Sequence, residues 1–202
     1  MKNRTSLRVA GALFKNMAIT SLWYLGIFAG VIVILQIFMT VLSEDTAALW
    51  EVAGYSTRIY LLVIGIVYPL TSLYHYIAAG VTRKQFATGL FLAAVLLSCG
   101  FAVLNIPWQL MANHFSPLRV LTDAVYGAFW FVVGWGAALG FQLRRVHTAV
   151  LGILCAHALL WGSQALAALP VPPWAPLPMM ACALCLVWLL LLQAVKRIAV
   201  NC

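Results

Sequence analysis

A succession of long apolar segments, separated by short polar ones, constrains this chain more than any other feature. Hydrophobic residues make up 65% of the 202 residues and charged residues only 8%, and the mean hydropathy is +1.02. Because a water-soluble domain typically carries about 25% charged residues, the composition excludes a soluble protein. It predicts an integral membrane protein whose apolar segments cross the bilayer as helices.

Six apolar segments have the length of membrane-spanning helices. They cover about residues 17–42, 59–79, 87–106, 121–141, 148–169 and 179–195. The preceding segment, residues 1–16, is basic, and its apolar residues recur at helical spacing, at Leu7, Ala10, Leu13 and Phe14. This pattern is typical of an amphipathic helix in the membrane interface. We therefore predict an all-α integral membrane protein with an amphipathic interfacial helix over residues 1–16 and a six-helix transmembrane domain over residues 17–202.

The basic residues between the apolar segments indicate the orientation. Only Arg58 and Arg119 fall on one side of the predicted membrane, whereas ten fall on the other: Lys2, Arg4, Arg8, Lys15, Arg83, Lys84, Arg144, Arg145, Lys196 and Arg197. Lys and Arg concentrate on the cytoplasmic side of membrane proteins. Both termini are therefore expected in the cytoplasm, and the acidic segment 43–58 is expected outside. The net charge of +8 reflects these clusters, so we do not expect a nucleic-acid partner.

One short polar segment between two apolar runs carries a recognisable pattern: Gly80, Val81, Thr82, Arg83, Lys84, Gln85 and Phe86. A glycine, a hydroxyl, two cations, an amide and an aromatic residue predict a tight turn between two helices at the cytoplasmic surface. Arg83 and Lys84 can make charge-assisted hydrogen bonds, and Phe86 can fill an apolar pocket of a partner. A positively charged turn with no partner is the alternative.

This segment resembles the loop between the second and third membrane helices of small six-span ABC-2-type permease subunits of bacteria, where a G-V-S/T-R-K/R-x-F run follows an apolar helix. The resemblance implies that residues 80–86 form a coupling loop that docks on a separate nucleotide-binding ATPase subunit. It also implies that two permease subunits, identical or different, pair in the bacterial inner membrane, and that residues 1–16 form a connecting helix beside the ATPase. A topological anchor is the alternative for that helix.

The chain contains no G-x-x-x-x-G-K-[S/T] phosphate loop and no H-E-x-x-H pair. We therefore expect no catalytic residue, no metal site and no cofactor bound by this chain, with ATP and magnesium held by the partner ATPase. The protein is not expected to be an enzyme.

Two features within the spans are candidates for function. His157 lies near the middle of the fifth apolar segment, where an ionisable group is a candidate functional site; a neutral imidazole that hydrogen-bonds a neighbouring helix is the alternative. Gly26 and Gly30 have the spacing that permits close helix contact. The resemblance places the first span at the subunit interface and so makes these glycines dimer contacts, whereas packing within one subunit is the alternative.

From these observations we expect the permease subunit of an ABC-type exporter that moves a peptide, a lipid or a hydrophobic drug. A membrane-embedded immunity or accessory protein without transport activity is the alternative. An intramembrane enzyme that uses His157 and a cysteine is a third possibility.

Overall fold

The structure is a computed structural model that describes residues 2–41, 47–111, 115–142, 147, 150, 153–154, 157–158, 161–162, 174 and 176–197. These residues form helices and no strands. The helices are α1 (Lys2–Val41), α2 (Ala47–Ala78), α3 (Arg83–Leu104), α4 (Ile106–Met111), α5 (Pro117–Gln142) and α7 (Pro176–Arg197). The predicted all-α class is therefore confirmed.

Five helices of the described part are long and apolar enough to cross a membrane. Their candidate spans are Thr5–Leu35, Ser56–Ala78, Arg83–Leu104, Pro117–Gly140 and Leu177–Val195. Residues 148–169, the expected fifth span, lie mostly outside the described residues, so the count of six spans stays a prediction.

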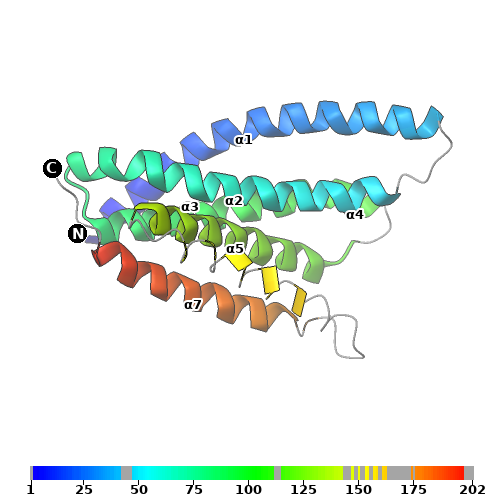
Figure 1. Cartoon of the computed structure of the whole chain (residues 1–202). Helices are drawn as coiled ribbons and strands as arrows, with labels where there is room; N and C mark the ends of the chain where they lie inside the picture. Colours follow the sequence, from blue (N-terminus) through cyan, green and yellow to red (C-terminus); the bar gives the residue numbers. More distant parts are fainter. Residues whose placement is uncertain are drawn as a thin grey trace.

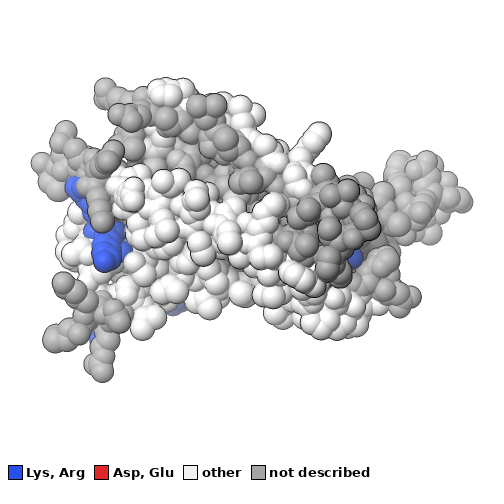
Figure 2. Space-filling view, turned by 90° about the horizontal axis from the view of Figure 1, so that it is seen from below, with Lys and Arg blue, Asp and Glu red and all other residues white. Residues whose placement is uncertain are grey.

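The long helices lie side by side, and most run the length of the molecule (Figure 1). α5 packs against α2, α3 and α7, and α1 packs against α3. The start of α1, the α2–α3 turn and the end of α7 lie at the same end, on the left of Figure 1. Figure 2 shows most of the visible Lys and Arg side chains at that end, so the folded chain separates a basic end from the opposite one.

Two glycines allow α2 and α5 to approach closely. A Cβ atom on Gly65 would overlap the carbonyl oxygen of Phe131, and one on Gly134 would overlap the carbonyl oxygen of Leu62. Small residues at such crossings permit backbone contact between membrane helices. The α2–α5 pair is therefore a tightly packed part of the fold.

Aromatic side chains attach α7 to the other helices. The Trp188 ring of α7 stacks on Phe91 of α3, with centroids 4.3 Å apart, and lies 5.6 Å from the ring of Trp135 in α5. Trp135 is itself fully buried. α3 and α5 thus present one joint surface on which α7 packs.

The predicted boundary at residue 16 is not a break in the backbone, because α1 is a single helix over Lys2–Val41. Its basic first part is amphipathic as predicted, with Arg8 and Lys15 exposed. Leu7, however, is exposed, and the buried residues are Val9, Ala10, Leu13 and Met17. Since Val9 packs directly on Gly89 of α3, this part of α1 joins the helix bundle.

The polar segment expected between the first two spans is largely helical. α2 begins at Ala47, well before the predicted start of the second span near residue 59. Ala47, Ala48 and Leu49 are strong helix formers, and they extend the helix beyond the apolar run that the hydropathy pattern detects. Residues 42–46 lie outside the described residues.

Candidate functional site at the α2–α3 turn

The end of α2 has the hydrogen-bond pattern of a Schellman cap. The N–H of Gly80 donates to the carbonyl of Ile77 at 2.9 Å, and the N–H of Val81 donates to the carbonyl of Tyr76 at 3.0 Å. Gly80 has a φ of 80°, a left-handed conformation that glycine adopts without steric cost. The glycine of the motif is therefore required by the local backbone.

The start of α3 is closed by a capping box between Thr82 and Gln85. The N–H of Gln85 donates to Thr82 Oγ1 at 3.3 Å, and the N–H of Thr82 donates to Gln85 Oε1 at 3.1 Å. Each side chain thereby satisfies a backbone donor that the first helical turn leaves unpaired. The turn is fixed at both of its helix ends.

Phe86 is a core residue. Only 1% of its surface is exposed, and its ring centroid lies 5.6 Å from that of Tyr76. The expectation that Phe86 fills an apolar pocket of a partner is therefore wrong, because its side chain is already packed between α2 and α3.

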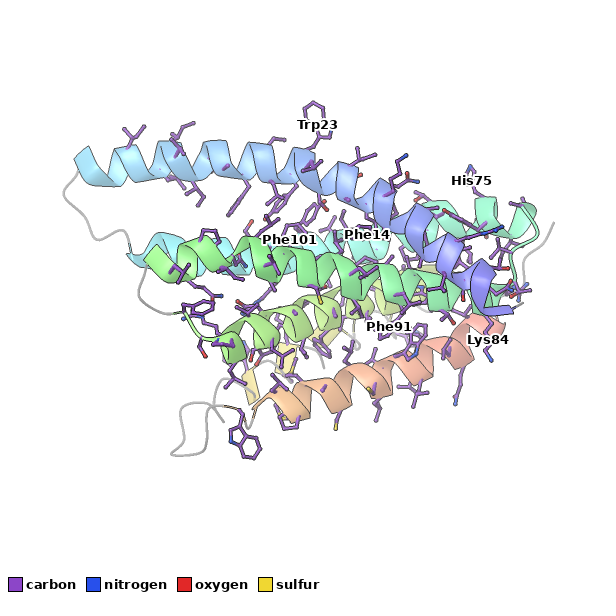
Figure 3. The ribbon with its side chains drawn as sticks, turned by 180° about the vertical axis from the view of Figure 1, so that it is seen from behind. Phe14, Trp23, His75, Lys84, Phe91 and Phe101 are labelled. Carbon is purple, nitrogen blue, oxygen red and sulfur yellow. The ribbon has the colours of Figure 1, made fainter. Side chains whose placement is uncertain are left out.

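The side chains of Arg83 and Lys84, unlike those of Thr82, Gln85 and Phe86, neither cap a helix end nor pack in the core. Arg83 is half-buried and Lys84 is exposed, and Figure 3 shows the Lys84 side chain directed away from the helices. Among the acidic side chains, the structure describes only Asp123, which pairs with Arg58 at the opposite end. Among the described residues, no carboxylate therefore neutralises the two cations.

Gly26 and Gly30 lie far from this turn, on the outer face of α1. Within the described part of the chain, no atom lies within 4 Å of a Cβ built on either glycine. Gly26 contributes to a shallow surface depression with Ile19, Leu22, Trp23 and Ile27. Packing within one subunit, the alternative considered for these glycines, finds no support in the described residues.

His157 is half-buried beside α5. Its Nδ1 lies 3.1 Å from the carbonyl oxygen of Ile153, four residues earlier in the chain, and its ring meets the Trp130 ring edge-on with centroids 5.0 Å apart. Among the described residues, no group of three His, Cys, Asp or Glu side chains comes together that could hold a metal ion. The contacts described for His157 are those of a packed, hydrogen-bonded imidazole.

A polar cluster that the sequence did not predict joins α2, α4 and α5 at the end opposite the turn. Asp123 Oδ1 lies 3.7 Å from Nη2 of Arg58, and Gln109 Nε2 donates to Asp123 Oδ2 at 3.0 Å. The Arg58 guanidinium also lies over the Tyr126 ring, 5.0 Å from its centroid. The Asp123 carboxylate therefore connects α2, α4 and α5 at this end. In the sequence, Arg58 and Arg119, the two cations on the predicted outer side, were the signal that could have indicated a polar cluster here.

No protein-family model, no curated protein and no solved structure matches this chain. The relation to ABC-2-type permeases is therefore an expectation drawn from residues 80–86.

Proposed function

We propose that this chain is a membrane-spanning permease subunit of an ABC-type exporter, driven by a separate ATPase that docks on the α2–α3 turn. One observation carries the proposal: the turn is capped at both helix ends and holds two cations, Arg83 and Lys84, that no described carboxylate neutralises. A rigid, basic projection is suited to binding in an acidic groove, because little conformational freedom is lost on docking.

A path for mechanical coupling also supports the proposal. Phe86 joins the turn to the core, and Val9 of α1 packs against Gly89, which lies about one helical turn after Phe86. Force applied at Lys84 would therefore reach α3 and the first part of α1 together. This part of α1 carries exposed Arg8, which adds to the basic surface at the same end.

The remaining parts of the proposal follow from the apolar surfaces. The open face of α1 around Gly26 and Gly30 would contact a second permease subunit, identical or different, in a bacterial inner membrane. The cargo would be a peptide, a lipid or a hydrophobic drug, because apolar residues dominate the spans. Both termini and the α2–α3 turn would face the cytoplasm.

Charge reversal at the turn tests this function. We would express tagged wild-type protein, the Arg83→Glu/Lys84→Glu variant and the matched Arg83→Gln/Lys84→Gln variant in the native host, and quantify a co-purifying protein with a phosphate loop. We expect the glutamate variant to retain roughly tenfold less ATPase, because two charge-assisted contacts become repulsive. Equal recovery of the ATPase with the glutamate variant would contradict docking at this turn.

A membrane-embedded accessory protein without transport activity is the second candidate, and a specific observation favours it. Five of the seven motif residues cap the turn or pack within the chain: Gly80, Val81, Thr82, Gln85 and Phe86. A purely structural turn needs these residues and no ATPase. In that case no ATPase would co-purify with the wild-type protein under any condition.

A further inference from the structure

The two halves of α1 are held very differently. In the first half, Val9, Leu13 and Met17 are buried against the bundle. In the second half, most apolar side chains are exposed, among them Leu22, Trp23, Ile27, Val31, Val33, Ile34 and Ile37. Figure 3 shows the ribbon of α1 diverging from the other helices beyond Trp23, whose side chain points outward.

Three hydroxyl pairs connect α1 to α2 where the two helices separate. Tyr24 Oη lies 2.9 Å from Ser56 Oγ, and Tyr60 Oη donates to Ser21 Oγ at 3.0 Å. The third pair joins Thr20 Oγ1 and Tyr68 Oη, also 2.9 Å apart. We call these six residues the hydroxyl seam. Each pair contains one tyrosine, so long side chains bridge a gap that the two backbones do not close.

Aromatic contacts add to the hydroxyl seam at one level. The rings of Tyr24 and Tyr60 are stacked with centroids 3.8 Å apart. Phe101 of α3 meets both rings edge-on, at 6.1 Å from Tyr24 and 5.7 Å from Tyr60. On α3 beside it, no described atom lies within 4 Å of a Cβ built on Gly100, and Val103 and Leu104 are exposed. Among the described residues, the second half of α1 therefore leaves these three positions of α3 uncovered.

A local feature of α1 marks where its two halves meet. Thr20 Oγ1 donates to the carbonyl of Asn16 at 3.1 Å, a bond from a hydroxyl to the preceding turn that often bends helices. Met17, between these two residues, is fully buried. The fixed half of α1 thus ends at Met17, which the core holds, three residues before Thr20, the first residue of the hydroxyl seam.

We propose that the second half of α1 is a strap that swings away from α2 about residues 16–20, so that the hydroxyl seam opens sideways to the lipid. Hydrogen bonds between membrane helices are individually weak, whereas α2 stays in place through Gly65 and Gly134 at its crossing with α5. Opening breaks the three hydroxyl pairs, the Tyr24–Tyr60 stack and the edge contact of Phe101 with Tyr24, and it exposes Ile32. The contacts among α2, α3, α5 and α7 are kept. The strap deepens the proposed function by giving an amphipathic cargo a lateral passage between α1 and α2.

Distance measurements between spin labels test the strap in the full-length protein, with the native cysteines replaced, in lipid nanodiscs. One pair, Ile34→Cys with Leu121→Cys, reports on the strap; a second pair, Leu7→Cys with Tyr74→Cys, reports on the fixed half. All four side chains are exposed. The variant Tyr24→Phe/Tyr60→Phe/Tyr68→Phe removes every hydroxyl pair of the seam and keeps every ring.

A matched control also removes three hydroxyls. Thr71, Thr88 and Thr122 donate to carbonyls of their own helices, those of Val67, Lys84 and Leu118. The variant Thr71→Val/Thr88→Val/Thr122→Val therefore lowers the polarity of the spans by the same number of groups without touching the hydroxyl seam.

We expect the phenylalanine variant to raise the ratio of long to short distances in the strap pair roughly 20-fold, and to leave the other pair and the control variant unchanged. If the triple variant does not fold, Tyr60→Phe alone should raise the ratio roughly threefold. An unchanged strap pair, or equal lengthening of both pairs, would overturn the proposal. The measurement needs neither ATPase nor cargo, so its failure would leave the proposed permease function standing.

Discussion

At the scale of single residues, the seven-residue motif divides into residues that build the turn and residues that the turn presents. Gly80 supplies the left-handed backbone, and Thr82 and Gln85 satisfy the first donors of α3. Phe86 anchors the turn in the core. A motif of this kind is thus explained mainly by the geometry of two antiparallel helices, and any specific recognition depends on Arg83 and Lys84.

Removing the cap at Thr82 tests this division. Thr82→Ala should lower the free energy of unfolding by about 1 kcal/mol, whereas Thr82→Ser should leave it nearly unchanged, because serine keeps the capping oxygen. Unfolding in mixed micelles with increasing denaturing detergent would measure both. Equal stability of the alanine and serine variants would show that the cap does not stabilise the turn.

At the scale of helices, the glycines separate into two classes that spacing in the sequence does not distinguish. Gly26 and Gly30 are one helical turn apart, yet no atom of the described residues lies within 4 Å of a Cβ built on either. Gly65 of α2 and Gly134 of α5 lie where these two helices cross, and a Cβ on either would overlap a carbonyl oxygen of the other helix. The spacing of glycines describes the surface of one helix only. Whether two helices cross at that surface depends on which second helix packs against it, so the sequence alone could not identify the α2–α5 contact.

Leucine substitutions in the two classes of glycine should affect different quantities, the stability of the fold in one class and the association of two subunits in the other. Gly134→Leu would force the α2 backbone away and should destabilise the protein by about 1–3 kcal/mol. Gly26→Leu/Gly30→Leu should leave unfolding unchanged and weaken the proposed dimer by about 1–2 kcal/mol. Unfolding and dimer dissociation can both be followed in detergent titrations. A loss of stability in the Gly26/Gly30 variant would return these glycines to packing within one chain.

Hydropathy predicted the five membrane-length helices of the described residues, because an apolar run in a bilayer must satisfy its own backbone hydrogen bonds. Helix boundaries and contacts were predicted less well. α2 extends before its apolar run because Ala47 and the residues after it favour helix, and α1 continues through residue 16 because nothing there interrupts the backbone. The contacts of Asp123 with Arg58 and Gln109 join different helices. The position of Arg58 on the predicted outer side was a signal for a polar cluster there, but no local pattern could indicate which residues would be its partners.

At the scale of the whole molecule, the two ends differ in chemistry. One end presents Arg83 and Lys84 without a described acidic partner, and the other holds Arg58 paired with Asp123. An excess of Lys and Arg is typical of the cytoplasmic face of membrane proteins. The proposed orientation, with the α2–α3 turn inside the cell, stays a prediction.

Labelling with a membrane-impermeant thiol reagent tests this orientation in a background without native cysteines. Phe115→Cys, at an exposed position between α4 and α5, should react in intact cells. Lys84→Cys should react only after the membrane is permeabilised. Labelling of Lys84→Cys in intact cells would reverse the orientation and remove the basis for an ATPase at the turn.

Crosslinking from the turn tests the central claim most directly. A photoreactive amino acid at Lys84, which is exposed, would be activated in native membranes, with the same group at exposed Leu121 near the start of α5 as the control. We expect Lys84 to form an adduct with a protein that contains a phosphate loop, and Leu121 to form none. Absence of such an adduct at Lys84, or equal adducts from both positions, would contradict docking of an ATPase on the α2–α3 turn.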